Sequence, residues 1–159
     1  MKEANSYSAS GTFGKVVAYR LLPGTDFMTG IRDLCNEHGI HHGALLSATG
    51  SLQKATFMVA APNEKAKLGS AYSEPSVKAG PIEVLTVQGM ILEDEGKVDF
   101  HIHGSFSDKD LNVFGGHLVE GENPVLVTME GVVAEISGTK LGRRYDEQVG
   151  GRVFHPAQS

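Results

Sequence analysis

Only one stretch of this chain has the pattern of a helix, whereas nearly every other apolar stretch is short and typical of a β-strand. Residues 27–38 carry apolar side chains at helical spacing, with Asp26 before them as a candidate N-cap and Gly39 after them as a candidate C-cap. Turn-forming residues bound the strand-like segments, which are 15–22, 43–49, 55–60, 82–92, 98–106, 113–119 and 124–136. We therefore expect an α+β fold, in which about seven strands form a mostly antiparallel sheet, curled toward a barrel or sandwich, beside one main helix.

The chain is short enough for one domain. It has 159 residues, and a chain of this length leaves little room for a second core. We place the domain at residues 12–154, with a frayed N-terminus at 1–11 and a tail at 155–159. Within the domain we expect a turn at Gly50-Ser51 and a long polar excursion at residues 62–80.

Composition excludes several classes of protein. Apolar residues make up 40% of the chain and charged residues 21%, and this balance has no signature of disorder. No apolar run approaches the roughly 18 residues of a membrane span, and the first ten residues lack the apolar core of a signal peptide. We expect a cytoplasmic protein without a membrane partner. The single cysteine, Cys35, lies in the helical stretch and is expected to be buried and inert.

Net charge argues against nucleic acid as the main partner. The formal charge is −5 and the isoelectric point is about 5.8. The 14 lysines and arginines are scattered, with Arg143-Arg144 as the densest cluster. A nucleic-acid binder normally presents a basic face, because neutralising phosphates supplies most of its non-specific affinity. Charge therefore gives DNA no support as a partner, although a local basic patch is compatible with the composition.

The most informative strand is 98–106, in which residue types alternate. Successive side chains of a strand point to opposite faces, so one face carries a core stripe of Val98, Phe100, Ile102 and Phe106. The opposite face carries Asp99, His101 and His103. Two imidazoles two residues apart on one face can reach a single metal ion, each offering a neutral nitrogen at about 2.0–2.1 Å.

His117 is the candidate third ligand. Thirteen residues separate it from His103, which suits a hairpin that folds the next strand back beside the first, and Gly115-Gly116 would let the two backbones approach closely. Three histidines with an open fourth position are the ligand set of catalytic zinc. The alternative is a half-exposed strand on which the histidines are simply solvated.

Glu130 and Arg20 also stand out. Glu130 lies in the middle of an apolar strand, where a buried carboxylate must be paired or protonated. It could be a hydrogen-bond partner of a ligating histidine, a general base, or one end of an ion pair with an arginine at a subunit interface. Arg20, near the end of the first strand, is a candidate partner for it or a residue that binds an anion. A solvated arginine is the alternative.

The last strand predicts self-association. Residues 124–136 are almost wholly apolar, so both faces of this strand need cover. A chain of this size with one helix can barely cover both faces by itself. We therefore expect a homo-oligomer.

Several short motifs occur in a fixed order between about Tyr19 and Phe154. They are RLLPGTD at 20–26, ATGSL at 48–52, IEVLTVQG at 82–89, HIHGSFSD at 101–108, VFGGHL at 113–118 and VTME at 127–130. In this order they resemble the plant- and prokaryote-conserved (PPC) domain, a family of unknown function. The resemblance covers nearly the whole chain, and it is carried by the order of the motifs more than by any one of them.

The resemblance implies a compact α+β fold with an antiparallel sheet, assembled as a homotrimer. In prokaryotic members the histidines matching His101, His103 and His117 are taken as zinc ligands. In plant members the domain follows AT-hooks, lacks those histidines and mediates oligomerisation and partner binding, and prokaryotic relatives carry a DNA-binding label through that kinship. This chain has no AT-hook core, is acidic and keeps the three histidines, and these departures weigh against the label here.

Two functions from different classes follow. The first is a zinc-dependent enzyme or small-molecule binder, in which the metal polarises a carbonyl or carboxylate or activates water. Glu130 or Asp99 would then act as acid or base, and Arg20 would hold an anionic group. The second is a trimeric, non-catalytic module that binds protein or DNA. The intact histidine set favours the first.

Overall fold

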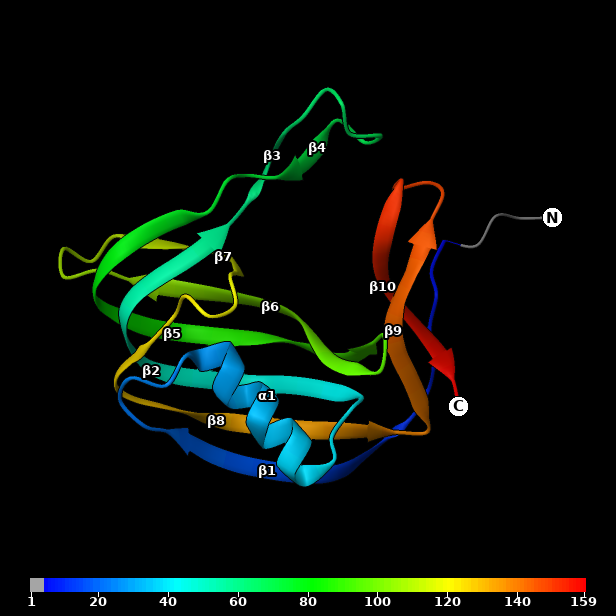
Figure 1. The fold of residues 1–159 in the computed structure, drawn as a ribbon, viewed down its shortest axis with the longest axis horizontal. Coiled ribbons are helices and arrows are strands. Elements are labelled where there is room, and N and C mark those ends of the chain that lie inside the picture. The colour runs from blue at the N-terminus through cyan, green and yellow to red at the C-terminus, as the bar shows by residue number, and fades with distance from the viewer. Residues whose placement is uncertain (1–4) are drawn as a thin grey trace.

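The computed structural model describes residues 5–159, and within them the chain forms one helix and ten strands. These elements are β1 (Thr12–Leu21), α1 (Phe27–His38), β2 (Gly43–Met58), β3 (Ala60–Pro62), β4 (Ser70–Tyr72), β5 (Ser76–Asp94), β6 (Lys97–Ser107), β7 (Val113–Leu118), β8 (Val125–Ser137), β9 (Thr139–Asp146) and β10 (Gly151–Gln158). Six strands form the main sheet in the order β1-β8-β2-β5-β6-β7, and its pairings are antiparallel (Figure 1). The α+β class with a mostly antiparallel sheet and one main helix is thereby confirmed.

The main sheet curls back on itself at one end. Most of β2 pairs with β8, but its last residues pair with β7 instead, Phe57 opposite Leu118 and Met58 opposite His117. At this end, β7 therefore lies between β6 and β2. The curl brings the end of β2 beside the strand that carries His117, and it makes one wall of the candidate site.

Helix α1 begins and ends where local capping signals place it. The Asp26 carboxylate accepts a hydrogen bond from the backbone N–H of Thr29 at 2.9 Å, and Gly39 ends the helix with φ 68°, a left-handed conformation that suits glycine. The same carboxylate accepts a hydrogen bond from the N–H of Asn123 at 2.8 Å, so the N-cap also ties the helix to the loop before β8. Both predicted caps are confirmed.

One face of the main sheet and one face of α1 form the core. The helix lies across this face of the sheet (Figure 1), and it buries Phe27, Ile31 and Cys35 completely. Cys35 is therefore the buried small side chain that the sequence predicted. The sheet contributes further fully buried apolar side chains, which include Leu45, Leu52, Ile82, Ile91, Ile102, Phe106, Met129 and Val133. The opposite face of the sheet stays open over much of its area, and it carries the histidines.

Two strand predictions are wrong because glycine was taken as a turn. Residues 43–58 form one continuous strand, β2, instead of two strands joined at Gly50-Ser51. A Cβ at Gly50 would lie 2.1 Å from the carbonyl oxygen of Thr128, so glycine here permits close approach of β8. Register shifts on both sides of Gly50 mark irregular pairing rather than a reversal of the chain.

The C-terminal region is also more regular than predicted. Residues 155–158, expected to be a tail, belong to β10, which pairs with β9 from end to end. The expected frayed start includes residues 1–4, which lie outside the described residues, while Thr12 already belongs to β1. None of the described helices has the length and apolar character that a membrane crossing requires.

Candidate metal centre

Three imidazoles converge on the open face of the main sheet. His101 and His103 come from β6, and His117 comes from β7 directly opposite His103. Their candidate ligand atoms all lie within 4.8 Å of one another, and the Nε2 atoms of His101 and His103 are 3.2 Å apart. Nitrogens bound to one tetrahedral zinc at about 2.05 Å would be about 3.3 Å apart. The His101–His103 pair therefore has the spacing that a single ion requires, and a ligand atom of His117 lies within 4.8 Å of both.

Alternation along β6 creates this arrangement. Phe100 and Ile102 point into the core and are buried, whereas His101 and His103 point to the opposite face and are partly or largely exposed. The predicted division of this strand into a core stripe and a histidine face is confirmed. The predicted metal ligands are thus brought together by the structure.

Glycine allows β7 to fit between its two neighbours. A Cβ at Gly115 would lie 2.1 Å from the carbonyl oxygen of Gly104, and a Cβ at Gly116 would lie 2.3 Å from that of Met58. Only residues without a side chain leave room for both approaches. The paired glycines therefore set the position of the adjacent His117, as their placement in the sequence suggested.

The environment favours the neutral, metal-binding form of two of the rings. Burial, with the charges of His103, His101 and Arg143, lowers the pKa of His117 to about 4. Burial, with the charges of His103 and Arg143, also lowers the pKa of His101. Asp99 acts in the opposite direction on both rings, but more weakly. Neutral imidazole nitrogens with a free lone pair are what a cation needs.

Tyr72 orients His117, and the sequence offered no signal for it. The Tyr72 hydroxyl lies 3.2 Å from Nδ1 of His117, and the two rings are 4.7 Å apart between centroids. Because Nδ1 is engaged, Nε2 is the nitrogen of His117 that remains for an ion. A hydrogen bond to the distal nitrogen of a ligating histidine fixes its tautomer and ring direction. Tyr72 lies in the polar excursion predicted at residues 62–80, 45 residues before its partner.

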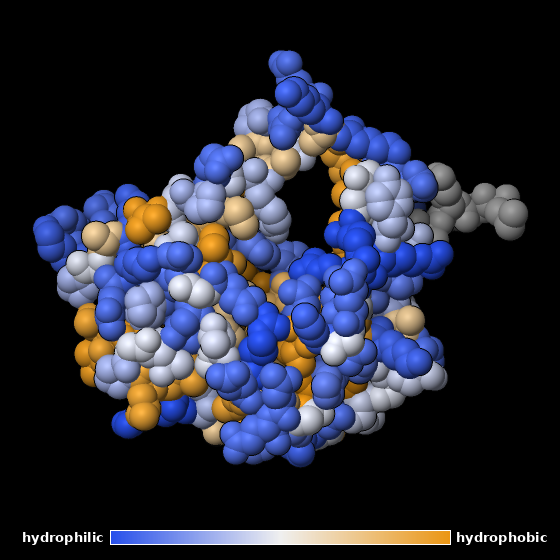
Figure 2. Space-filling view, viewed as in Figure 1, coloured by the Kyte–Doolittle hydropathy of each residue, from blue (hydrophilic) through white to orange (hydrophobic). Residues whose placement is uncertain are grey.

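A cavity of about 560 Å³ opens beside the histidines. His101, His103 and Gly116 border it on the sheet side, and Met58–Ala60 with Ser70–Tyr72 border it on the side of the β3–β4 hairpin. This hairpin reaches across to the turn between β9 and β10, where Lys67 Nζ donates a hydrogen bond to the carbonyl oxygen of Glu147. Figure 2 shows the open space enclosed between the β3–β4 excursion at the top and the β9–β10 hairpin at the right.

Asp99 lies next to the cluster but is already paired. Arg143 of β9 donates from Nε to Oδ2 of Asp99 at 2.6 Å and from Nη2 to the carbonyl oxygen of Phe100 at 2.8 Å. Asp99 is thus held by an arginine 44 residues away in the sequence. The sequence marked Arg143 only as part of a small basic cluster, and only the fold places it beside β6.

Glu130 and Arg20 lie far from the histidines within one chain. They are directly opposite each other on β8 and β1, whereas the sheet order puts three strand spacings between β8 and β6. At about 4.8 Å per spacing, Glu130 lies about 14 Å from β6 along the sheet, and Arg20 about 19 Å. The prediction that Glu130 is buried is wrong for this chain, because its side chain points to the open face and is exposed.

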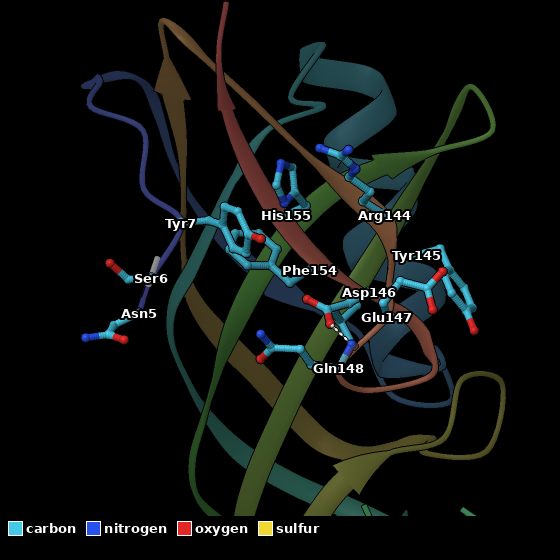
Figure 3. Close-up of a pocket in the computed structure, with 11 residues that line it drawn as sticks. Asn5, Ser6, Tyr7, Arg144, Tyr145, Asp146, Glu147, Gln148, Phe154 and His155 are labelled. Carbon is cyan, nitrogen blue, oxygen red and sulfur yellow. Dashed lines mark hydrogen bonds between the residues drawn. The ribbon is translucent and has the colours of Figure 1, made fainter. Parts of the chain in front are cut away.

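A second hollow of about 510 Å³ lies between residues 5–7 and the β9–β10 hairpin (Figure 3). The rings of Tyr7 and His155 are 4.8 Å apart there, and Arg144, Tyr145 and Phe154 also line it. None of the histidines of the cluster borders it. The histidine cluster and this hollow are therefore separate features of the surface.

Comparison with known proteins identifies what the chain is similar to. The family model described as the Plants and Prokaryotes Conserved (PCC) domain matches residues 8–137. A metal-containing protein from Archaeoglobus fulgidus has a similar structure, with a TM-score of 0.77 and 27% sequence identity over 95% of this chain and 99% of that one. A plant- and prokaryote-conserved (PPC) protein from Pyrococcus horikoshii has a TM-score of 0.78 and 23% identity, covering 97% of this chain and all of that one.

Other relatives carry different names. A structure from Bacteroides thetaiotaomicron, named as a candidate DNA-binding protein, shares the fold with a TM-score of 0.72 and 19% identity over 92% of this chain and 97% of that one. A bifunctional protein GlmU from Synechococcus is 28% identical over 89% of this chain. The chain spans only about a fifth of the length of that curated relative.

Proposed function

Since this chain belongs to the Plants and Prokaryotes Conserved (PCC) domain family, we propose that it is a cytoplasmic zinc protein that binds or transforms a small anionic or carbonyl-containing molecule. The zinc ligands are His101, His103 and His117. The observation that carries the proposal is the convergence of these three imidazoles, two of which, His101 and His103, border one cavity.

The donor set suits zinc and leaves a coordination position free. Three neutral imidazoles on adjacent strands are a zinc ligand set, and the cavity beside them can admit a further ligand. The similar protein from Archaeoglobus fulgidus is named as metal-containing, which supports a metal here. Zinc bound at this position would supply a Lewis acid for a carbonyl or carboxylate oxygen, or would acidify a bound water.

The residues of the chain itself position and tune this site. Tyr72 holds the His117 ring by its Nδ1 atom, and Arg143 holds Asp99 beside His101. Asp99 is the candidate acid or base that lies closest to the ligands along β6, and its pairing with Arg143 through Oδ2 favours its ionised form.

Within one chain, Glu130 and Arg20 lie three and four strand spacings from β6. We propose that the protein is a homotrimer in which a neighbouring copy brings these residues, a second candidate base and an anion-binding group, toward the site. Exposed apolar side chains on the same face of the sheet support self-association, among them Val16, Leu46 and Leu85.

The alternative is a trimeric, non-catalytic module that binds DNA or protein. The names of similar structures from Bacteroides thetaiotaomicron and Ralstonia eutropha favour DNA binding, although at 19% and 20% identity they share only the fold with this chain. The net charge of −5 opposes it.

The decisive experiment measures metal content in the wild type, in His103→Ala and in His38→Ala. His38 lies in the last turn of α1, outside the cluster, and serves as the control. We expect about one zinc per chain in the wild type and in the control, and none in His103→Ala. A wild type without metal, or equal metal in all three proteins, would refute the proposal.

A gel-shift assay with duplex DNA at two salt concentrations distinguishes the proposed function from the DNA-binding alternative. The proposal predicts no binding of duplex DNA at either concentration. Binding that weakens steeply with added salt would instead identify phosphate contacts and favour the DNA-binding module.

A further inference from the structure

The cavity beside the histidines has an apolar wall opposite its polar floor. The wall consists of Met58, Val59, Ala60 and Ala71 with the ring of Tyr72. Val59 is 44% exposed and Tyr72 is 50% exposed, so apolar surface faces solvent within reach of the cluster. No lysine, arginine, aspartate or glutamate is among the described residues that line the cavity.

Backbone contacts hold this wall in place. Ser73 donates its N–H to the carbonyl oxygen of Val59 at 2.8 Å, and its Oγ accepts the N–H of Val59 at 3.2 Å. Ala60 pairs with Tyr72 across the β3–β4 hairpin. The wall is therefore a fixed surface of the hairpin, and Tyr72 belongs both to the wall and to the support of His117.

The charges at the histidine side of the cavity favour a ligand that carries a single anionic group. Three neutral histidine ligands leave the double positive charge of a bound zinc uncompensated, so an anionic donor is favoured as the fourth ligand. Arg143 is paired with Asp99 and is not among the residues that line the cavity, so the cavity itself offers a ligand no second cationic side chain. A second negative group on the ligand would lie against the apolar wall, without a cation to receive it.

We infer that the cavity selects small monocarboxylates with an uncharged, apolar body, and discriminates against dicarboxylates and phosphorylated molecules. The inference rests on the proposed zinc site and names its substrate class. The carboxylate binds at the metal, and the apolar body lies along Val59, Ala71 and Tyr72. A volume of about 560 Å³ is within the usual range for small-molecule cavities.

Binding of simple acids to the cobalt-loaded full-length chain tests the inference, with the visible spectrum of the metal as the readout. Affinity is expected to rise about two- to fourfold per methylene from acetate to butyrate to hexanoate. Hexanoate and adipate have the same number of carbons, and adipate is expected to bind at least about tenfold more weakly because its second carboxylate meets the apolar wall. Inorganic phosphate is expected to bind no better than acetate.

A matched pair of variants locates the apolar body. Val59→Asn places a neutral polar group in the wall, and Val77→Asn does the same on the exposed part of β5, outside the cavity. The affinity of Val59→Asn for hexanoate should be at least about threefold lower than that of the wild type, while its affinity for acetate should be unchanged. Val77→Asn should bind both acids like the wild type.

The outcomes separate this inference from the proposed function. A protein that takes up neither zinc nor cobalt refutes the zinc site and the substrate class together. A fully loaded protein that binds hexanoate and adipate equally well, or shows no dependence on chain length, refutes the substrate class alone.

Discussion

The β6–β7 pair and the β1–β8 pair both place polar side chains opposite one another on the same open face of the main sheet. His103 lies opposite His117 in the first pair, and Arg20 lies opposite Glu130 in the second. Only the first forms a cluster with its neighbours, because His101 joins it from the same strand and Tyr72 braces it from the β3–β4 hairpin. Arg20 and Glu130 are exposed on long, flexible side chains.

The difference shows that direct register does not by itself make a site. The β6–β7 pair also has a third strand against it, the end of β2, and glycines that allow the close approach. Short rigid rings in a crowded corner lose little conformational freedom when they converge. Long side chains on an open face lose more, which is why exposed ion pairs contribute little. The following experiments compare the two regions.

Removal of one metal ligand should have the largest effect. His117→Ala should weaken zinc binding by more than the roughly 10- to 100-fold that loss of a supporting hydrogen bond costs. Glu130→Ala, on the same face of the sheet, should leave zinc affinity unchanged within about twofold. Competition with a chelating dye measures both variants. A comparable loss in both would mean that the two regions act as one site.

Adding a methyl group should reveal through stability how tightly β7 is confined. Gly116→Ala forces a Cβ against the carbonyl oxygen of Met58 and should lower the free energy of unfolding by about 1–3 kcal/mol. At Gly151 in β10 no atom lies within 4 Å of the position of an added Cβ, so Gly151→Ala should cost about 0.5 kcal/mol or less. Urea denaturation measures both values. Equal costs would show that β7 is not confined by its neighbours.

Loss of the Tyr72 hydroxyl should have a moderate effect. Tyr72→Phe removes the hydrogen bond to Nδ1 of His117 but keeps the ring, and zinc affinity should fall roughly 10-fold. Tyr145→Phe, on an exposed side chain of β9, is the control and should bind zinc like the wild type. If both variants bind zinc equally well, Tyr72 does not orient the ligand.

The pH dependence should be the smallest effect. The pKa of His117 lies at about 4 in the folded chain and at its ordinary value of 6.5 in the unfolded chain. Between these values the unfolded chain binds the proton more readily, so acidification from pH 6.5 toward 4 lowers the stability of the metal-free protein, and no such loss occurs above 6.5. Denaturation at about pH 7.5 and about pH 5 should therefore show a smaller loss for His117→Gln than for the wild type.

An NMR titration of the metal-free wild type checks the same assignment directly. The imidazole signals of His117 should stay at their neutral positions well below pH 6.5. A midpoint near 6.5 would contradict the buried, crowded environment of the ring.

Local patterns in the sequence predicted α1 and the face of β6 that carries two histidines of the cluster. The caps at Asp26 and Gly39 act on residues within a few positions of themselves, and the two-residue alternation of 98–106 decides which side chains share a face. His117 could be predicted to lie near His101 and His103 because a hairpin places the next strand of the chain beside the strand 98–106. These features depend on contacts that are short along the chain.

The tertiary structure alone decided the remaining features of the site. Tyr72 and His117 are 45 residues apart, and Arg143 and Asp99 are 44 residues apart. No local sequence pattern predicts either contact. Gly50 looked like a turn because the strand that passes close to it, β8, lies far along the chain. Glu130 was expected to be buried, as a partner of a histidine, a general base or one end of an ion pair, but the fold leaves it exposed and three strand spacings from β6. Alternation and capping are properties of neighbouring residues, whereas strand order and cavity walls arise only when distant segments pack together.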